Sequence, residues 1–492
     1  MPGSVEELFR EAGLTPRPGQ LEAAETLAWH IEHGARVVFS APVGWGKTNA
    51  VLAALKAARA LPALWLVRSL ALGARISEDA AVWGLIAFTA AGRERVCPLA
   101  ERLGDAVHEF CRYYRYKCPY ARLPEPPVAA VDWEHLARIA QEKGFCAYLA
   151  QDLVEADVVV QNYHRRLRPA RAFVVDEAHN LLVPREREYS AQALTDAISL
   201  LVEKGEAGLA RKLEYTLASA LTEDGPVTLD ISEDERAALR RLHFEALGEG
   251  DARLKPVIDM TTAAAVYSEG GRIRVYKPSV PYLLHVRPAV FVSATLPREA
   301  LGMLGAEVEL RIPWVVRARA LIVEGLTTKW ESFDSRMAER YVKLLLRVGR
   351  SCRRVIVFAA SERVARELRS WATYEEVVPP PGWEGVLLLR ARGRFSEGVD
   401  LPSECVVVAG CPYLPPSVSE RLASVYRRAG IEQAARLARD IPMLVATLQS
   451  VGRAWRDPQK PPTVYLADER FARYSGELEE YLEIQTTSLD KL

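Results

Sequence analysis

The sequence predicts two α/β domains, each built on a mainly parallel β-sheet, with two further segments inserted into the first domain. The chain has 492 residues, which is too long for one ordinary domain. Short apolar runs recur along it in two series, and each run is followed by a helical or polar segment. Continuous apolar runs of this length suit strands that are buried on both faces of a parallel sheet.

The strand signals can be placed by residue. The first series comprises residues 37–39, 63–67, 157–160, 173–175 and 290–292, and the second comprises residues 355–358, 386–389, 406–408 and 464–466. Strands that alternate with helices in two groups indicate two α/β domains.

Two stretches without this alternation are interpreted as insertions into the first domain. Residues 92–150 carry four cysteines, a Pro-rich turn and a helical segment over 133–143. Residues 191–280 are mostly helical and end in a hairpin signal around Gly270-Gly271. The expected organisation is a first domain made of residues 1–91, 151–190 and 281–312, insertions at 92–150 and 191–280, and a second domain at 313–492.

Composition constrains the class of protein less sharply. Hydrophobic residues make up 49% and charged residues 26% of the chain, which is typical of a globular protein. Lys plus Arg and Asp plus Glu balance at 64 each, but nucleic-acid binding depends on local basic stripes, so it stays open. The sequence has neither a signal-peptide pattern nor an apolar stretch long enough to span a bilayer, and a soluble, cytoplasmic protein is expected. Asparagine is scarce, which hints at a thermophilic source.

A phosphate-binding loop is predicted after the first strand. Ala41-Pro42-Val43-Gly44-Trp45-Gly46-Lys47-Thr48 precedes a helical segment, so backbone N–H groups and a helix N-terminus can surround phosphates. Besides Gly44 and Gly46, Lys47 is expected to reach the β- and γ-phosphates, and Thr48 to bind Mg²⁺.

Two further patterns in the first domain complete this nucleotide site. Asp176-Glu177-Ala178-His179 follows an apolar strand, where Asp176 would hold Mg²⁺ and Glu177 would activate the attacking water. His179 could relay between binding sites or only satisfy a buried hydrogen bond. Ser293 and Thr295, in Ser293-Ala294-Thr295-Leu296, are expected to bond the acidic pair and the neighbouring domain, although an ordinary turn is the alternative.

The second domain supplies two more patterns. Gly393 to Leu401, which includes Asp400, follows the strand at 386–389, and Gln449 to Arg456 lies late in the chain. Arg453 and Arg456 are three residues apart and share a helical face. Across a cleft they could stabilise charge on a γ-phosphate, a role worth about 10³–10⁵ in rate in related chemistry. The alternative is that these two arginines only lie on a solvated face of the helix.

The order of these motifs resembles that of superfamily 2 DNA helicases of the XPD/DinG (Rad3-related) type. The loop with Ala41 in place of Gly, Val67 to Ser69, the Asp-Glu-Ala-His segment and Ser293 to Leu296 are similar to motifs I, Ia, II and III. Val357 to Ser361, Gly393 to Leu401 and Gln449 to Asp457 are similar to motifs IV, V and VI, and Ala156 to His164 is similar to a family segment before motif II. The resemblance implies two RecA-like domains that clamp ATP, with Gln20, Asp400 and Gln449 also at the nucleotide, Gln20 by a loose match together with Arg17. It also implies 5′→3′ movement on DNA and a repair role such as nucleotide excision repair.

The cysteine quartet is the candidate metal centre. Cys97, Cys111, Cys118 and Cys146 include no CxxC pair, so a zinc-ribbon signature is lacking. Four thiolates on separate loops can hold an iron–sulfur cluster, and the resemblance implies a 4Fe–4S cluster in this insertion; zinc and two disulfides are the alternatives. Cys352, Cys405 and Cys411 are expected to be buried small hydrophobes.

A cationic and aromatic run lies between two of these cysteines. It consists of Arg112, Tyr113, Tyr114, Arg115, Tyr116 and Lys117. Cations suit phosphates and rings suit bases, so the run is a candidate DNA contact. Alternatively, the tyrosines pack around the cluster and the cations are only solvated.

The sequence therefore predicts a monomeric ATP-dependent DNA helicase that uses ATP, Mg²⁺ and a 4Fe–4S cluster on single-stranded and forked DNA. Two alternatives remain: a translocase that remodels nucleoprotein without separating strands, and a redox-responsive DNA-binding protein without motor activity. Residues 191–280 are short for the full arch of this family, so a reduced arch is expected.

Overall fold

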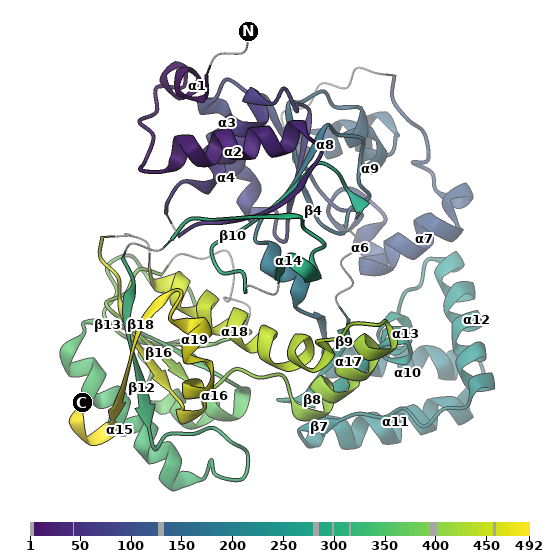
Figure 1. The fold of residues 1–492 in the computed structure, drawn as a ribbon. Helices are drawn as coiled ribbons and strands as arrows, with labels where there is room; N and C mark the ends of the chain where they lie inside the picture. Colours follow the sequence, from purple (N-terminus) through teal and green to yellow (C-terminus); the bar gives the residue numbers. More distant parts are fainter. Residues whose placement is uncertain are drawn as a thin grey trace.

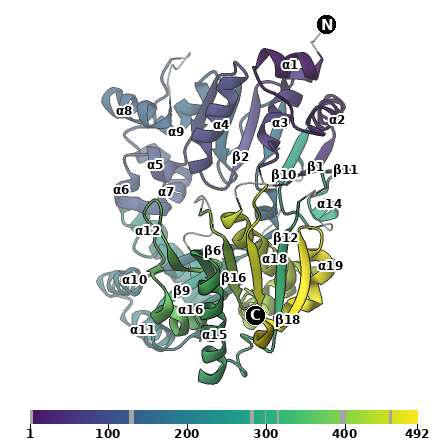
Figure 2. The same ribbon diagram turned by 90° about the vertical axis from the view of Figure 1, so that its left-hand side faces the viewer.

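The structure of the chain is a computed structural model that describes residues 4–42, 44–125, 132–278, 285–297, 300–313, 316–393, 401–455 and 459–492. Figure 1 shows two sheet domains, the N-terminal one at the top and the C-terminal one below it. The two inserted segments lie together on one side of the molecule, which the rotated view in Figure 2 also shows.

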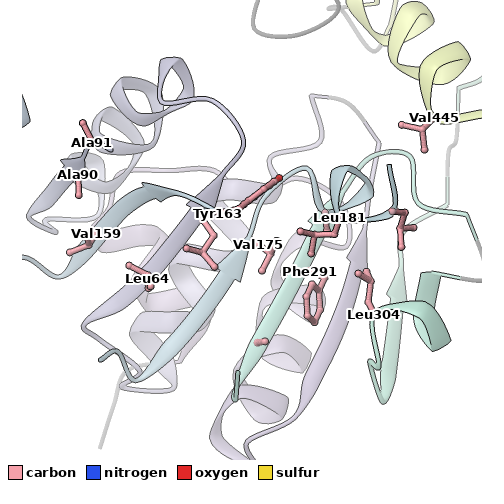
Figure 3. Close-up of a cluster of buried hydrophobic side chains, with 14 of the residues drawn as sticks. Leu64, Ala90, Ala91, Val159, Tyr163, Val175, Leu181, Phe291, Leu304 and Val445 are labelled. Carbon is pink, nitrogen blue, oxygen red and sulfur yellow. The ribbon is translucent and has the colours of Figure 1, made fainter. Parts of the chain in front are cut away.

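The first domain is a RecA-like domain built on a seven-stranded sheet in which every pair of neighbours is parallel. The strand order is β11 (Val308–Arg311), β1 (Arg36–Ser40), β10 (Ala289–Ser293), β5 (Ala172–Val175), β2 (Ala63–Val67), β4 (Val158–Asn162) and β3 (Ala87–Ala90). Val38 of β1 enters one hydrophobic core while Val37 and Phe39 enter the other, and Figure 3 shows part of the former around Phe291. Burial on both faces explains the continuous apolar runs, and all five predicted strands of this series are confirmed.

The second RecA-like domain is built on the same kind of parallel sheet as the first. Its seven parallel strands follow the order β14 (Tyr374–Glu375), β15 (Gly385–Arg390), β13 (Arg354–Ala359), β16 (Cys405–Ala409), β17 (Thr463–Ala467), β12 (Ala318–Glu324) and β18 (Leu482–Ser488). The four predicted strands are again present. Its helices include α15 (Ser335–Ser351), α16 (Glu362–Leu368), α17 (Pro416–Arg428) and α18 (Ala434–Ala454).

Helices α17 and α18 connect the two domains. Val418, Leu422 and Tyr426 of α17 are buried in the same hydrophobic core as Val38 and Phe291 of the first sheet. In Figure 1 the two helices extend from the second domain toward the inserted strands β8 (Ala265–Glu269) and β9 (Arg272–Lys277). Ile441 and Val445 of α18 join this shared core, whereas Leu448 and Val451 near the end of the helix pack in the core of the second domain.

The first insertion is a set of short helices. They are α5 (Arg93–Val96), α6 (Ala100–Leu103), α7 (Val107–Tyr113), α8 (Trp133–Lys143) and α9 (Ala147–Ala150). Helix α8 has the bounds that the sequence predicts: Asp132 caps its start by accepting a hydrogen bond from His135 N, and Gly144 ends it in the left-handed conformation.

The second insertion combines helices with an antiparallel sheet. Its helices are α10 (Ala191–Glu203), α11 (Ala207–Thr222), α12 (Glu233–Glu249) and α13 (Lys255–Thr262), and its sheet has the order β6 (Arg185–Tyr189), β9, β8 and β7 (Gly225–Pro226). The predicted hairpin is β8–β9, which turns at Gly270 and Gly271 with positive φ. Strand β6 precedes the expected start at residue 191, because its charged sequence carries no apolar signal.

The two insertions contact each other through α7 and α12. Val107 and Phe110 of α7 pack with Leu247 of α12, and Glu109 lies 2.5 Å from Nε2 of His243 and 2.9 Å from Nζ of Lys255. Figures 1 and 2 both show the two helices as neighbours. In the described part of the chain no helix is both long and apolar enough to cross a membrane.

Candidate functional site

The phosphate loop connects β1 to α3 (Lys47–Ala57). Gly44 and Gly46 have φ values of +74° and +93°, a region that L side chains rarely adopt. A Cβ at Gly46 would also lie 2.6 Å from Nε2 of Gln20. Lys47 and Thr48 are the first two residues of α3, so their backbone N–H groups belong to the open helix N-terminus, which attracts anions.

Lys47 and Gln20 are both hydrogen-bonded to this loop. Nζ of Lys47 donates to the carbonyl oxygens of Ala41 and Pro42 at 2.9 and 3.0 Å. Burial lowers the pKa of Lys47 to about 8, although Asp176 and Glu177 counteract that shift. Gln20 begins α2 (Gln20–Glu32), donates to the carbonyl of Gly46 at 2.9 Å and accepts from Arg17 N at 2.8 Å. The loose match at Gln20 therefore belongs to a residue that touches the loop.

The acidic pair follows β5 at the carboxyl edge of the first sheet. Burial raises the pKa of Asp176, whose carboxylate accepts hydrogen bonds from Glu177 N at 2.9 Å and from the Trp65 indole at 3.4 Å. Glu177 has φ +48° and ψ +46°, the left-handed conformation. The electrostatic influence of both acids on Lys47 places the three groups in one site.

A chain of polar contacts leads from this site into the second domain. His179 Nδ1 lies 2.8 Å from Ser293 Oγ, which in turn accepts a hydrogen bond from Thr295 N at 3.1 Å. Oγ1 of Thr295 then accepts a hydrogen bond of 3.1 Å from Nε2 of Gln449 on α18. Residues that the sequence assigns to motif II (His179), motif III (Ser293 and Thr295) and motif VI (Gln449) thus form one chain of polar contacts. This chain crosses from the first domain to the second.

Arg453 lies on the same helix as Gln449, one turn further on. It is buried, with 5% of its surface exposed, and its charge helps to lower the pKa of His179 to about 3, although burial of His179 is the larger cause. His179 is therefore neutral at physiological pH, and a guanidinium of the second domain lies near the acidic turn of the first. Arg456 and Asp400, which the sequence also assigns to this site, are outside the described residues.

The structure places two residues without a role predicted from the sequence, Trp65 and Tyr163, against the acidic pair, and it places Arg68 of the motif Ia match beside the same turn. Trp65 bonds Asp176, the hydroxyl of Tyr163 donates to the main-chain carbonyls of Asp176 and Glu177, and Arg68 donates to Asn180 Oδ1 at 2.6 Å. Tyr163 lies in the segment 156–164 that resembles the family, and this is the one signal that could have singled it out.

The four cysteines of the first insertion surround one small apolar cavity of about 30 Å³. Arg93, Phe110 and Tyr148 also line it. Burial raises the pKa of Cys97 to about 11 and also raises that of Cys118. Among the described residues, no three His, Cys, Asp or Glu side chains meet the geometry of a site for a metal ion.

The other three cysteines differ from the expectation in part. Cys405 and Cys411 are buried as expected, but Cys352 and Cys405 form a disulfide with their Cα atoms 6.1 Å apart. The prediction that all three are buried small hydrophobes is therefore wrong for Cys352, which is only half-buried, and it missed the disulfide. The end of α15 lies beside the start of β16, a proximity that the sequence separation of 53 residues conceals.

The candidate DNA-contact run divides into two groups. Tyr114 is half-buried, and its hydroxyl donates to the carbonyl of Phe244 at 2.6 Å, while Nζ of Lys117 donates to the carbonyl of Gly248 at 3.2 Å. Both residues therefore contact α12. Tyr113 is exposed but also packs edge-to-face against Phe244 of α12, with 4.9 Å between the ring centroids. The other three side chains are exposed: Arg112, Arg115 and Tyr116.

Comparison with known proteins places these observations in context. Residues 333–484 match the family described as the helicase C-terminal domain. The chain is 22% identical over 458 residues to the ATP-dependent DNA helicase XPD of Sulfolobus acidocaldarius, covering 77% of this chain and 82% of the relative.

Solved structures give the same picture of the fold. A structure described as an XPD helicase aligns over 96% of this chain and all of its own length, with a TM-score of 0.73 and 20% identity. The structure of S. tokodaii Xpd4 aligns over 96% of this chain and all of its own, with a TM-score of 0.63 and 16% identity.

Proposed function

We infer that this chain is a superfamily 2 helicase of the XPD type, an ATP-dependent DNA helicase that moves along single-stranded DNA and separates duplexes. The observation that carries the inference is the cross-domain contact between Gln449 and Thr295, which Ser293 and His179 connect to the segment that carries Asp176 and Glu177. An ATPase whose site is shared by two domains can convert nucleotide turnover into relative domain movement.

In the proposed reaction each group has one task. Lys47 and the N–H groups of the loop bind the phosphates, while Asp176 and Thr48 offer oxygen ligands that suit Mg²⁺. Glu177 orients the attacking water and takes its proton. Arg453, together with Arg456, stabilises the charge that develops on the transferred phosphoryl group. Because Gln449 and Arg453 belong to the second domain, hydrolysis requires the two domains to be closed against each other around the nucleotide.

The iron–sulfur cluster is the proposed occupant of the cysteine cavity. A single zinc ion draws four sulfur ligands to about 2.3 Å from one centre, whereas a cuboidal cluster takes one thiolate at each of four iron corners. Thiols that surround a cavity fit the second arrangement. Bound there, the cluster would crosslink α5, α7 and α9 into a rigid body.

The finer features are proposed from the same resemblance. They are 5′→3′ polarity, a monomeric state, a part in DNA repair such as nucleotide excision repair, and the division into RecA-like domains (1–91, 151–190 and 281–312; 313–492), a cluster domain (92–150) and an arch-like insertion (191–280). The exposed cations and tyrosines between Cys111 and Cys118 support a DNA contact on the cluster domain.

The proposal is tested by two assays on anaerobically purified full-length chain. We expect single-stranded DNA to accelerate ATP hydrolysis, and ATP to drive strand displacement from a partial duplex with a 5′ overhang but not from one with a 3′ overhang. ATPase stimulation without displacement would leave a translocase. DNA binding without ATP hydrolysis would leave a non-motor protein.

The pH dependence of ATP binding follows from Lys47. Its pKa of about 8 means that the charged form, which binds phosphates, is lost from the free protein as the pH rises above 8. We expect the Kd for a fluorescent ATP analogue to be constant below pH 7 and to rise by up to about tenfold per pH unit above 8. The Lys47→Arg variant stays charged and should lack this rise, even if it binds more weakly. A flat wild-type profile to pH 9.5 would contradict the assignment.

Loss of one cavity thiol should separate ATP hydrolysis from unwinding. Wild-type chain is expected to contain about four iron and four sulfide, and Cys111→Ser to lose them while still hydrolysing ATP on single-stranded DNA. Strand displacement should fail, because the first insertion would no longer be a rigid feature at the fork. Cys411→Ser, which changes a buried thiol outside the cavity, is the matched control. Stoichiometric zinc without iron would exclude the cluster, and full strand displacement by Cys111→Ser would show that unwinding does not need a rigid first insertion.

A further inference from the structure

Tyr163 is a buried phenol, 2% exposed, that reaches the catalytic turn from a neighbouring loop. Figure 3 shows its side chain extending from the end of β4 to the segment between Val175 and Leu181. The hydroxyl donates to the carbonyl of Asp176 and, at 3.2 Å, to that of Glu177. A phenol carries one proton, so the two carbonyls share it. The contact therefore fixes the backbone of the acidic pair rather than its carboxylates.

The turn that Tyr163 holds is one that needs external support. Glu177 has φ +48°, and a non-glycine residue in the left-handed region persists only where its surroundings enforce it. The Glu177 carboxylate must also point at the attacking water. A small rotation of this backbone would turn the carboxylate away from that water.

The main chain of Tyr163 is attached to the segment that matches motif Ia. Tyr163 N donates to the carbonyl of Val67 at 3.0 Å, and the Asn162 side chain donates to the carbonyl of Arg68. Arg68 is exposed at the carboxyl end of β2, where its guanidinium is suited to a nucleic-acid phosphate. Movement of the Arg68 backbone would thus be transmitted to Tyr163.

A second connection between the same two segments ends at the same carbonyl. The Arg68 guanidinium donates to Asn180 Oδ1 at 2.6 Å, and Asn180 N donates to the carbonyl of Glu177 at 2.9 Å. The Glu177 carbonyl therefore accepts from Tyr163 on one side and from Asn180 on the other. Both donors are anchored to the Arg68 segment.

We propose that Tyr163 is a positioning residue that transmits the binding of single-stranded DNA at Arg68 to Glu177. Bound DNA then accelerates ATP hydrolysis through this phenol. The inference rests on the proposed function. It concerns kcat, because Tyr163 contacts the turn of the water-activating residue and not the phosphate loop.

The test is steady-state ATP hydrolysis by full-length Tyr163→Phe with and without a saturating single-stranded oligonucleotide. We expect kcat with DNA to fall about tenfold, as for loss of one buried hydrogen-bond donor. The basal rate should fall by a smaller factor, and the KM for ATP and the Kd for the oligonucleotide should stay within about twofold. Tyr341→Phe is the matched control: its buried hydroxyl donates to the carbonyl of Ala467 at 2.5 Å in the second domain, and its loss should leave the DNA stimulation intact.

Several outcomes would overturn this role. Unchanged stimulation in Tyr163→Phe, or an equal fall in basal and stimulated rates, would reduce Tyr163 to a structural residue. Fold-losses that multiply in Arg68→Ala combined with Tyr163→Phe would place the two on separate paths, whereas no further loss supports one path. If wild-type chain shows no DNA stimulation, the proposed function fails together with this inference. If DNA stimulates ATP hydrolysis equally in wild type and in Tyr163→Phe, this inference fails and the proposed function stands.

Discussion

Glu177→Gln is expected to bind ATP and single-stranded DNA with near wild-type affinity and to hydrolyse ATP about 10²–10⁴-fold more slowly. Glutamine keeps the size of the side chain and its hydrogen-bonding capacity but cannot take the proton of the attacking water. The left-handed backbone at Glu177 is unaffected by the substitution, since both side chains branch at the same carbon. The complex should therefore stop before hydrolysis.

Lys47→Ala should abolish turnover by a different route. Nζ of Lys47 bonds two carbonyls of the loop, so truncation removes a phosphate ligand and a support of the loop together, and ATP binding itself should weaken. Nucleotide affinity and single-turnover hydrolysis, measured separately, distinguish the two variants. Glu32→Gln, an exposed substitution at the far end of α2, serves as the control. Wild-type DNA-stimulated rates in either active-site variant would refute the site.

The central strands were predictable from sequence because burial on both faces leaves a continuous apolar run. Strands β2 and β17 are examples, with almost every side chain buried. Strands β3 and β11 at the edges of the first sheet were not predicted, because they are short and only partly buried. Strand β6 is charged, and its partner β9 follows it in the sequence only after nearly the whole second insertion. No local sequence pattern reveals so distant a partner.

The candidate site divides in a similar way. Lys47, Asp176 and Glu177 lie at strand ends, and the topology of a parallel sheet brings such ends together, so their proximity follows from the sequence pattern. The contacts of Tyr163 with the acidic turn and of Tyr114 with Phe244 depend on tertiary packing between segments that carry no shared signal. The same aromatic run contains both a packed and an exposed ring, since Tyr116 near Tyr114 is 78% exposed.

Arg453→Ala should lower kcat by about a thousandfold or more while it changes ATP affinity little. The guanidinium is buried and lies near His179 rather than on a solvated surface. A charge at this position meets the negative charge that develops in the transition state, so its loss is felt in kcat. Arg453→Lys should recover part of the rate, because it restores the charge without the planar fork of donors.

Arg439→Ala is the matched control for this experiment. Arg439 lies on the same helix, is exposed, and pairs with Asp440 at 2.8 Å, so its loss reports the effect of removing any arginine from α18. Buried Asp440 keeps the hydrogen bond that it accepts from the Tyr474 hydroxyl at 2.8 Å, and kcat should not change. Arg453 also lowers the pKa of His179, so its removal should raise that pKa. Burial is the larger cause of the shift, however, and His179 should stay neutral near pH 7. A fall in kcat that persists unchanged from pH 6.5 to 8.5 would therefore be due to the missing guanidinium and not to a protonated His179. If Arg453→Ala lost ATP binding with kcat preserved, Arg453 would be a ground-state ligand of the nucleotide.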